Sequence, residues 1–268
     1  MSNEQTPGRG DVQITAQQRE RLREVWIHSR DALQQVVSDL KITQDELNFA
    51  GRYFNRLGKS DMFPSLLAVG LAMTSLRATE GNEGGTPPNL EGPFHMKNAP
   101  IRKDGVLWET QPGPDARYLK LTGTVRDVES GAPLEGVELD FWHANEDGGY
   151  DNTGFNLRGR ILSDENGHYM LNTIVPKDYS EHDNDPIGEF FQALDRHNRR
   201  AAHIHLKANK PGFVPLTTQL YMPDGAYLND DYVEGAVIPE LIINFDQISQ
   251  DGRNISAQYD FAISPAAA

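Results

Sequence analysis

The chain has 268 residues, a length that suits one large domain or one domain with a helical appendage. Hydrophobic residues make up 38% and aromatic residues 9% of the sequence, so we expect a packed core rather than a disordered chain. A formal net charge of −14 argues against nucleic acid as a partner, and the lack of cysteine excludes disulfides and thiolate metal sites.

The N-terminus carries no sign of export or membrane insertion. The opening residues, MSNEQTPGRGDVQ, are polar and lack the apolar core of a signal sequence. The longest apolar run lies near PSLLAVGLAM and is too short to cross a bilayer. We therefore expect a cytoplasmic protein without a membrane span.

The first third of the chain predicts helices. Thr15 and Gln18 have the spacing of a capping box, and apolar residues follow at steps of three and four. Thr43 and Glu46 repeat this spacing before a second apolar face. With a third helix expected to follow, we assign residues 1–85 to an N-terminal helical region.

The third helix is expected from about Asp61 to Arg77, and the composition changes after it. Residues 79–114 are dense in Gly, Pro and Asn, which predicts a long connection. A fourth helix is expected near residues 186–196, inside an otherwise β-rich region.

From Arg117 onward the sequence predicts strands. Short, partly alternating apolar runs are separated by turn residues: YLKLTGTV, VELDFWHA, HYMLNTIV, AHIHLKA, LTTQLYM, LIINF and AQYDFAI. Several short strands without alternating helices are typical of an antiparallel β-sandwich. The expected fold class is therefore mainly β, with the sandwich in residues 86–268.

Two histidines stand out in the run RRAAHIHLKANKPG. His203 and His205 are separated by one residue on a predicted strand, so their side chains point to the same side. Taken alone the pair is a weak signal, because a strand histidine is more often a packed core residue.

Three polar residues occur in strand-end or strand positions that could bring them near this pair. Tyr150 follows the strand at 137–144 after a Gly-Gly turn, Tyr179 lies in the loop VPKDYS, and Gln219 lies on the strand after the histidines. Each also has a purely structural interpretation, because glycine turns, alternating strands and a Pro-x-x-Tyr occur in prealbumin-like sandwich modules. His143, in WHAN, is expected to be structural.

The remaining histidines are expected at the surface or in caps: His28, His95, His168, His182 and His197.

The motifs WHANEDGGY, FNLRGR, SDENGHY, VPKDY, RHNRRAAHIH and GFVPLTTQL, in this order, resemble the intradiol ring-cleaving dioxygenases. The resemblance covers roughly residues 87–227 and favours the branch of the catechol and hydroxyquinol 1,2-dioxygenases. It implies a prealbumin-like fold and a non-haem Fe(III) ion, with Tyr150, Tyr179, His203 and His205 as its ligands. It also implies that the N-terminal helices form a homodimer, with a phospholipid at the interface.

The ligand types suit a ferric ion. Free tyrosine has a pKa of about 10, so only a strong Lewis acid holds two ionised phenols near neutral pH. Two phenolates and a hydroxide balance the charge of Fe(III). The resemblance implies that a catechol replaces Tyr179, which then takes a substrate proton as general base. It further implies that O₂ cleaves the ring between the two hydroxylated carbons and gives a cis,cis-muconate-type diacid.

Two more residues match the family by position. Arg200 aligns with an arginine that lies over the substrate, where a guanidinium can stabilise anionic character in the ring. The alternative for Arg200 is a surface ion pair. Gln219 aligns with a glutamine next to the site, and its alternative is a strand residue that bonds a loop.

The pocket walls are expected to be apolar, which suits a flat aromatic ring: Leu66, Leu67, Gly70, Gly92, Pro93, Phe94, Ile174 and Val175. Catechol and hydroxyquinol are the expected substrates. The sequence lacks a basic residue dedicated to a ring carboxylate, which argues against protocatechuate.

The sequence departs from the family in three places. The segment YDNTGFNLRG after Tyr150 is shorter, so the site is expected to be more open. Ala201 replaces the usual proline before AHIH, and VPKDY replaces a more usual Pro-Ala-Gly-Tyr, so the loop that carries Tyr179 lacks a glycine.

Two other functions remain in competition. A non-enzymatic prealbumin-like binding module would keep the glycine turns and the strand pattern, but it gives no reason for the tyrosines and histidines to occur together. A copper or zinc site on the His-x-His pair would need a third histidine nearby, and His143 is the one candidate.

Overall fold

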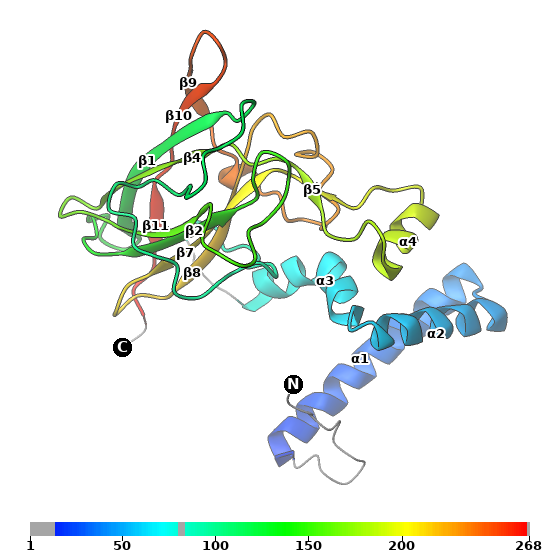
Figure 1. Ribbon diagram of the computed structural model, residues 1–268. Helices are drawn as coiled ribbons and strands as arrows, with labels where there is room; N and C mark the ends of the chain where they lie inside the picture. The colour runs from blue at the N-terminus through cyan, green and yellow to red at the C-terminus, as the bar shows by residue number, and fades with distance from the viewer. Residues whose placement is uncertain (1–13, 80–83, 267–268) are drawn as a thin grey trace. The chain divides into compact units, whose positions relative to one another are not determined.

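The computed structural model describes residues 14–79 and 84–266. The chain divides into two compact units, one ending at Lys59 and the next beginning at Ser60. The first unit contains α1 (Ala16–Leu40) and α2 (Gln44–Lys59) (Figure 1). Since α3 (Phe63–Thr79) follows the boundary, it belongs to the unit that contains the strands, although the sequence groups it with the helices.

Both predicted caps are present. The side chain of Thr15 accepts the N–H of Gln18, and the side chain of Gln18 accepts the N–H of Thr15. Thr43 and Glu46 make the same reciprocal pair before α2. These bonds satisfy N–H groups that a helix leaves free in its first turn, which explains where the two helices begin.

The helices of the first unit carry large exposed apolar side chains. None of the residues of α1 is buried. Trp26, Leu33 and Leu40 are 64%, 65% and 72% exposed, respectively. Among the described residues, no single helix is long and apolar enough to cross a membrane, and only α2 and α3 taken together meet that test, by length and composition alone.

The larger sheet consists of five strands: β1 (Tyr118–Asp127), β4 (His168–Ile174), β9 (Phe245–Ile248), β10 (Asn254–Gln258) and β11 (Phe261–Ile263). This sheet is mixed rather than antiparallel, because β10 and β11 both run parallel to β1. Tyr118 pairs with Asn254 and Val125 pairs with Phe261, so the C-terminal chain follows β1 as one strand interrupted at residues 259–260.

The smaller sheet is antiparallel and has four strands in the order β3 (Arg158–Leu162), β2 (Glu138–His143), β7 (His203–Asn209) and β8 (Leu216–Tyr221). The strand predicted at LIINF starts later than expected. Pro239–Leu241 forms a 3-10 turn, Ile242 makes an isolated bridge to Tyr221, and only Phe245 of this run belongs to a strand, as the first residue of β9. The last helix, α4, covers Pro186–Ala193. A two-residue ladder joins β5 (Tyr179–Ser180) to β6 (Arg199–Arg200).

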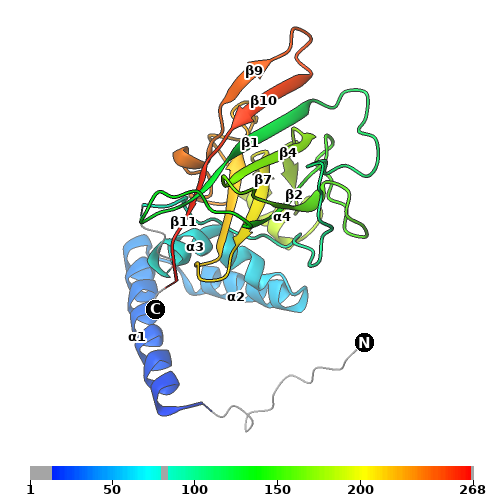
Figure 2. The ribbon, with the colours of Figure 1, turned by 90° about the vertical axis from the view of Figure 1, so that its left-hand side faces the viewer.

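Both sheets contribute to one buried apolar cluster. Leu121 and Phe261 enter it from the larger sheet, and Leu139 and Leu206 from the smaller sheet, and all four are fully buried. In Figures 1 and 2, β2, β7 and β8 lie together against the strands around β1. This shared core fixes β7, the histidine strand, between β2 and β8.

Gly123 marks the tightest place in this packing. A β-carbon at Gly123 would overlap the carbonyl oxygen of Tyr259 and lie 2.9 Å from the ring of Tyr169. We expect Gly123→Ala to lower the free energy of unfolding by about 1–3 kcal/mol or more, measured by urea unfolding of the full chain. Gly51→Ala in α2 is the matched control, because a β-carbon added at Gly51 would meet no neighbouring atom within 4 Å. It should change stability by no more than about 1 kcal/mol, and in the favourable direction.

Candidate metal centre

The site is built around two imidazoles on β7. His203 and His205 are each 1% exposed, and their Nε2 atoms face each other at 3.0 Å. Their cross-strand neighbours on β8 are Tyr221 and Gln219, respectively. The strand alternation therefore places both rings on one face, as the spacing predicts.

The surroundings orient the two rings. Nδ1 of His203 bonds to the carbonyl oxygen of Ala201 at 2.6 Å, which fits a proton on Nδ1 and leaves the Nε2 lone pair free. His205 is stacked on Trp142 with centroids 4.7 Å apart and planes 3° from parallel. A β-carbon at Gly92 would lie 3.3 Å from Cε1 of His205, so this glycine leaves just enough room for the ring.

Both imidazoles are neutral at ordinary pH. Burial is the main cause that lowers the pKa of His203 and of His205 well below the usual value, and the charge of Arg200 acts in the same direction. Neutral imidazole is the form that binds a metal ion, so the protein holds these rings ready for that role.

Tyr150 reaches the site through a tight turn after β2. The side chain of Asn145 accepts the N–H groups of Asp147 and Gly149 and closes this turn. Gly148 has φ 89°, and a β-carbon there would lie 3.1 Å from Cβ of Tyr179. Glycine at this position therefore permits both the turn and the close approach of the second tyrosine.

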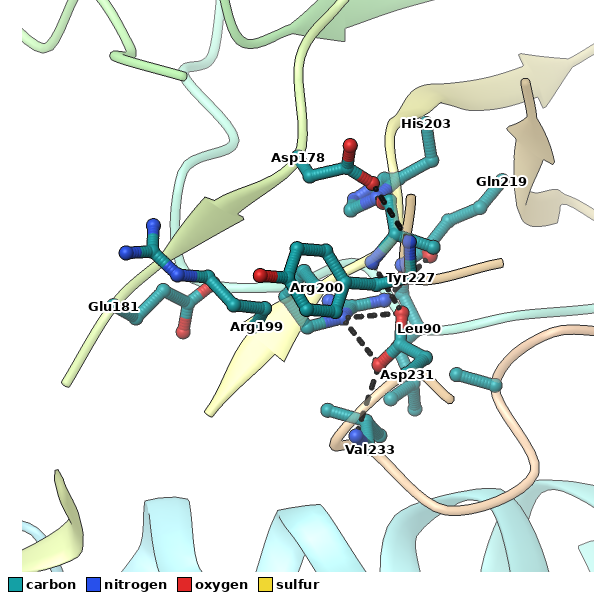
Figure 3. Close-up of polar contacts among 12 residues, drawn as sticks. Leu90, Asp178, Glu181, Arg199, Arg200, His203, Gln219, Tyr227, Asp231 and Val233 are labelled. Atoms are coloured by element: carbon teal, nitrogen blue, oxygen red, sulfur yellow. Dashed lines mark hydrogen bonds and ion pairs between the residues drawn. The ribbon is translucent and has the colours of Figure 1, made fainter. Parts of the chain in front are cut away.

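Tyr179 lies on β5, directly opposite Arg200 on β6. Its hydroxyl donates to Oε1 of Glu181 at 3.2 Å. The carboxylate of Asp178 accepts the N–H of Ala202 at 2.9 Å, together with two weaker N–H contacts from residues 226 and 227. Asp178 thus ties the tyrosine loop to the start of the histidine strand. Figure 3 shows Asp178 near Tyr227 and His203.

The four rings form one group. The ring centroids of Tyr150 and Tyr179 are 5.3 Å apart, those of Tyr179 and His203 5.6 Å, and those of Tyr150 and His205 6.4 Å. The hydroxyl of Tyr150 is buried and makes no hydrogen bond of ordinary geometry within the described residues. A buried polar group without a partner is unusual and fits a position for a ligand atom.

The donor set fits a hard metal ion. Two metal–imidazole bonds of about 2.1 Å at a right angle place their nitrogens about 3.0 Å apart, as the two Nε2 atoms are here. No group of three or more His, Asp or Glu side chains suitable for a metal occurs in the described part of the chain. A metal at the histidine pair would therefore depend on the phenol oxygens of Tyr150 and Tyr179.

The phenols need a cation in order to ionise. Burial is the main cause that raises the pKa of Tyr150 and of Tyr179 above the usual value, and an ionised Tyr150 would act in the same direction on Tyr179. The guanidinium of Arg200 opposes the shift at both tyrosines. Without a bound cation both groups stay protonated at neutral pH, so metal binding would release their protons.

Arg158 is a residue that sequence reasoning missed. It is 1% exposed, lies over the ring of Tyr150 at 5.8 Å, and donates to the carbonyl oxygens of Asp151 and Phe94. Its only signal was its place in the motif FNLRGR, where an arginine occurs inside a strand. A buried arginine requires such partners, but the sequence does not say which ones they are.

Arg200 and Gln219 form a buried polar group beside the histidines. Nη2 of Arg200 donates to Oε1 of Gln219 at 2.9 Å, and Nε2 of Gln219 donates to the carbonyl oxygen of Leu90 at 2.7 Å. Arg200 is 3% exposed and pairs with Asp231. The alternative of a surface ion pair for Arg200 therefore does not hold.

The expected pocket walls lie in different surroundings. Phe94 stacks on Tyr150 with centroids 4.3 Å apart, and Gly92 touches His205. Its neighbour Pro93 is exposed. Ile174 is fully buried in a small cluster with residues 116 and 157, next to the half-buried ring of Trp108.

The helical wall residues lie on α3. Leu66 is half-buried, whereas Leu67 and Gly70 are exposed on this helix. Its buried face is formed by Val69 and Met73 instead. Val175 is buried at the end of β4 and belongs to the main core.

His143 is held by two hydrogen bonds of its own. Nδ1 bonds to the carbonyl oxygen of Ala144 at 2.7 Å, and Nε2 bonds to the hydroxyl of Thr173 at 2.6 Å. Both ring nitrogens are thus occupied, which removes the one candidate for a third imidazole ligand. His95 is not a surface residue as expected, because its ring bonds to Asp140 at 3.0 Å and packs on Trp142.

Comparisons with known proteins agree with this site. A family model described as Dioxygenase matches residues 90–265. Catechol 1,2-dioxygenase of Acinetobacter baylyi is 34% identical over an alignment 225 residues long, and the match covers 77% of this chain and 72% of that protein. Hydroxyquinol 1,2-dioxygenase of a Rhizobium species is 28% identical over an alignment 248 residues long, and the match covers 87% of this chain and 82% of that protein.

A solved structure shows the same fold. The crystal structure of hydroxyquinol 1,2-dioxygenase from Pseudomonas putida DLL-E4 superposes with a TM-score of 0.83 and 26% identity, covering 92% of this chain and 93% of that one. The mixed sheets and few helices of this chain fit that fold. The chain belongs to the intradiol ring-cleaving dioxygenase family.

His143 makes stability sensitive to acid. Burial lowers the pKa of His143 from 6.5 to about 4, so the unfolded chain binds a proton below pH 6.5 that the folded protein does not. Stability is therefore full above pH 6.5 and falls as the pH drops toward 4. We expect a loss of about 2 kcal/mol between pH 7 and pH 5 from His143 alone, measured by urea unfolding of metal-free protein.

The matching variants are His143→Gln and His168→Gln. The first should make the dependence of stability on pH less steep by the share of one buried imidazole, because His203 and His205, whose pKa values burial also lowers, remain. The second changes an exposed histidine, with a side chain 62% exposed, and should leave the slope as it is. An unchanged slope in His143→Gln would contradict the assignment.

Proposed function

We propose that the protein uses a non-haem Fe(III) ion to cleave a catechol-class ring, catechol or hydroxyquinol, with O₂ between the two hydroxylated carbons. The product is a cis,cis-muconate-type diacid. The observation that carries this proposal is the approach of two neutral imidazoles to 3.0 Å beside the rings of Tyr150 and Tyr179. Relatives named catechol, chlorocatechol and hydroxyquinol 1,2-dioxygenase support it.

The four proposed ligands are of two chemical types. His203 and His205 would offer Nε2 lone pairs, while Tyr150 and Tyr179 would offer phenolate oxygens. When bound, the ferric ion supplies Lewis acidity that ionises a catechol and draws electron density from its ring. The imidazoles add no charge, and the two phenolates reduce the net charge inside a dry site.

The two tyrosines have different surroundings, which suits two different roles. Tyr150 is stacked on Phe94 and lies under the guanidinium of Arg158, so a cation faces its ring. Tyr179 instead donates its hydroxyl to the carboxylate of Glu181. We infer that Tyr150 remains an anionic ligand, and that Tyr179 accepts the proton of a substrate hydroxyl as general base.

Arg200 and Gln219 would act on the substrate side of the site. The guanidinium lies opposite Tyr179 and is positioned to stabilise anionic ring character. Gln219 accepts from Arg200 and lies opposite His205, so it holds the cation against the histidine strand. Phe94 and Gly92 border the rings and would face the bound aromatic ring, with Pro93, Leu66, Leu67, Gly70 and Ile174 as further proposed walls.

We further propose that residues 1–85 form a homodimer interface, with a phospholipid bound there. Residues 86–268 would form the catalytic β-sandwich, and the protein would be cytoplasmic. The exposed apolar side chains of α1 support the dimer, because monomers rarely leave so many large apolar groups in water. The core shared by the two sheets supports the sandwich.

Pure protein supplied with ferric ion should be wine-red, because tyrosinate bound to Fe(III) absorbs visible light. We expect Tyr179→Phe to shift or bleach this band and to lower kcat by at least about 100-fold, since a ligand and a general base are both lost. The measurements are visible absorption, iron per chain, and oxygen uptake with catechol and hydroxyquinol.

Tyr118→Phe is the matched control, because it removes a hydroxyl bonded to Gln111 away from the four rings. It should keep the wild-type colour and rate. A colourless wild-type protein that takes up no iron would instead favour a binding module, and uptake of zinc or copper alone would favour the other metal site.

The dimer has its own test. Light scattering at micromolar concentration should give twice the chain mass of 29.9 kDa. Trp26→Glu should shift the protein toward the monomer, because it places a charge in the apolar face of α1. Ser38→Glu, on the opposite face of α1, should leave the dimer intact. A monomeric wild-type protein would remove the dimer proposal.

A further inference from the structure

Asp231 is a buried carboxylate that neither the motifs nor the four-ring site account for. Its side chain is 3% exposed and forms an ion pair with Arg200, whose side chain is 4% exposed. Nε of Arg200 lies 3.0 Å from one carboxylate oxygen and 3.1 Å from the other. Figure 3 shows this pair at the start of the histidine strand.

The same carboxylate also binds two backbone groups. It accepts the N–H of Ala201 and the N–H of Val233, each at 2.9 Å. A carboxylate with these partners cannot rotate without breaking several charge-assisted bonds at once. The position of Asp231 is therefore fixed by the backbone on both sides, independently of Arg200.

The other end of the guanidinium is held as well. Nη2 of Arg200 donates to Oε1 of Gln219 at 2.9 Å and to the hydroxyl of Tyr221 at 3.4 Å. The hydroxyl of Tyr221 donates to the same oxygen of Gln219 at 2.6 Å. Burial alone would lower the pKa of Arg200, but the charge of Asp231 holds it well above its usual value.

One nitrogen of the guanidinium is left over. Among the described residues, Nη1 of Arg200 makes no hydrogen bond, whereas Nε and Nη2 both do. Arg200 pairs with Tyr179 across β5 and β6, and its charge acts on His203 and His205 as well. The guanidinium is thus held in place by Nε and Nη2, and the N–H groups of Nη1 remain available to a molecule bound at the four rings.

We propose that Asp231 is a positioning residue, which holds the Arg200 guanidinium in the one orientation that keeps Nη1 free for an anionic aromatic substrate. The Asp231 carboxylate has its hydrogen-bond partners in Arg200, Ala201 and Val233 rather than in the four rings. Its effect on the reaction passes through Arg200, because a guanidinium without its anion can rotate about the side-chain bonds. This inference rests on the proposed ring-cleaving function.

The test compares Asp231→Asn with its neighbour Asp230→Asn. Asp230 is an exposed residue, with a side chain 69% exposed, that pairs with His197. We expect Asp231→Asn to lower kcat for catechol by about 10- to 100-fold, with KM changed less than about threefold. The reason is that a misplaced guanidinium stabilises the transition state less well, while it affects substrate binding only slightly. Asp230→Asn should match the wild type. Iron per chain and the visible band should be the same in all three proteins.

A double-variant comparison separates positioning from general loosening. If Asp231 acts through Arg200, Arg200→Gln/Asp231→Asn should be no slower than Arg200→Gln, within about twofold. This comparison needs only these two proteins, both without the unpaired buried cation, so it decides the matter even where Asp231→Asn does not fold. A further loss in the double variant would overturn the proposal, as would wild-type kcat in Asp231→Asn.

A second readout does not depend on turnover. In metal-free full-length protein, the Nε–H of Arg200 should give a nuclear magnetic resonance signal that exchanges slowly with water, identified by its loss in Arg200→Gln. Asp231→Asn should speed this exchange, and Asp230→Asn should not. Unchanged exchange in Asp231→Asn would overturn the proposal. A wild-type protein that cleaves no catechol would instead remove the proposed function, while this signal still reports on the ion pair.

Discussion

The distance of 3.0 Å between Nε2 of His203 and Nε2 of His205 is the constraint on which the site depends. Two neutral imidazoles whose Nε2 atoms are this close in a dry interior need a proton or a cation between these atoms. Because Ala201 fixes the tautomer of His203, its lone pair points inward. The strand fixes the direction of both rings, so the surrounding residues must supply charge balance and oxygen donors.

Before a metal ion binds, the site contains neutral phenols and two buried arginines. Arg200 and Arg158 are almost completely buried, and each lies near a tyrosine ring. Burial keeps the phenols protonated until a cation arrives, so the site does not contain two unpaired buried anions. The ion pair of Arg200 with Asp231 in turn keeps one cation from being isolated.

Two departures from the family pattern acquire a physical meaning in this arrangement. Ala201 stands where a proline is usual, and its N–H donates to Asp231, a bond that proline cannot make. Asp178 stands where the loop of Tyr179 usually has a glycine, and its carboxylate binds backbone N–H groups of the histidine strand and of the loop at 226–227. In this chain, side-chain anchors restrain the segments that carry the ligands.

The sequence by itself determined the local features. The caps at Thr15 and Thr43, the common face of His203 and His205, and the turn before Tyr150 all follow from short-range spacing or hydrogen bonding. The tertiary structure alone decided which distant groups meet. Asp231 and Arg158 carry no motif that names their partners, and the parallel pairing of the C-terminal strand with β1 joins residues more than 130 positions apart. Spacing encodes direction along one element, whereas burial of charge depends on what the rest of the chain brings to the same place.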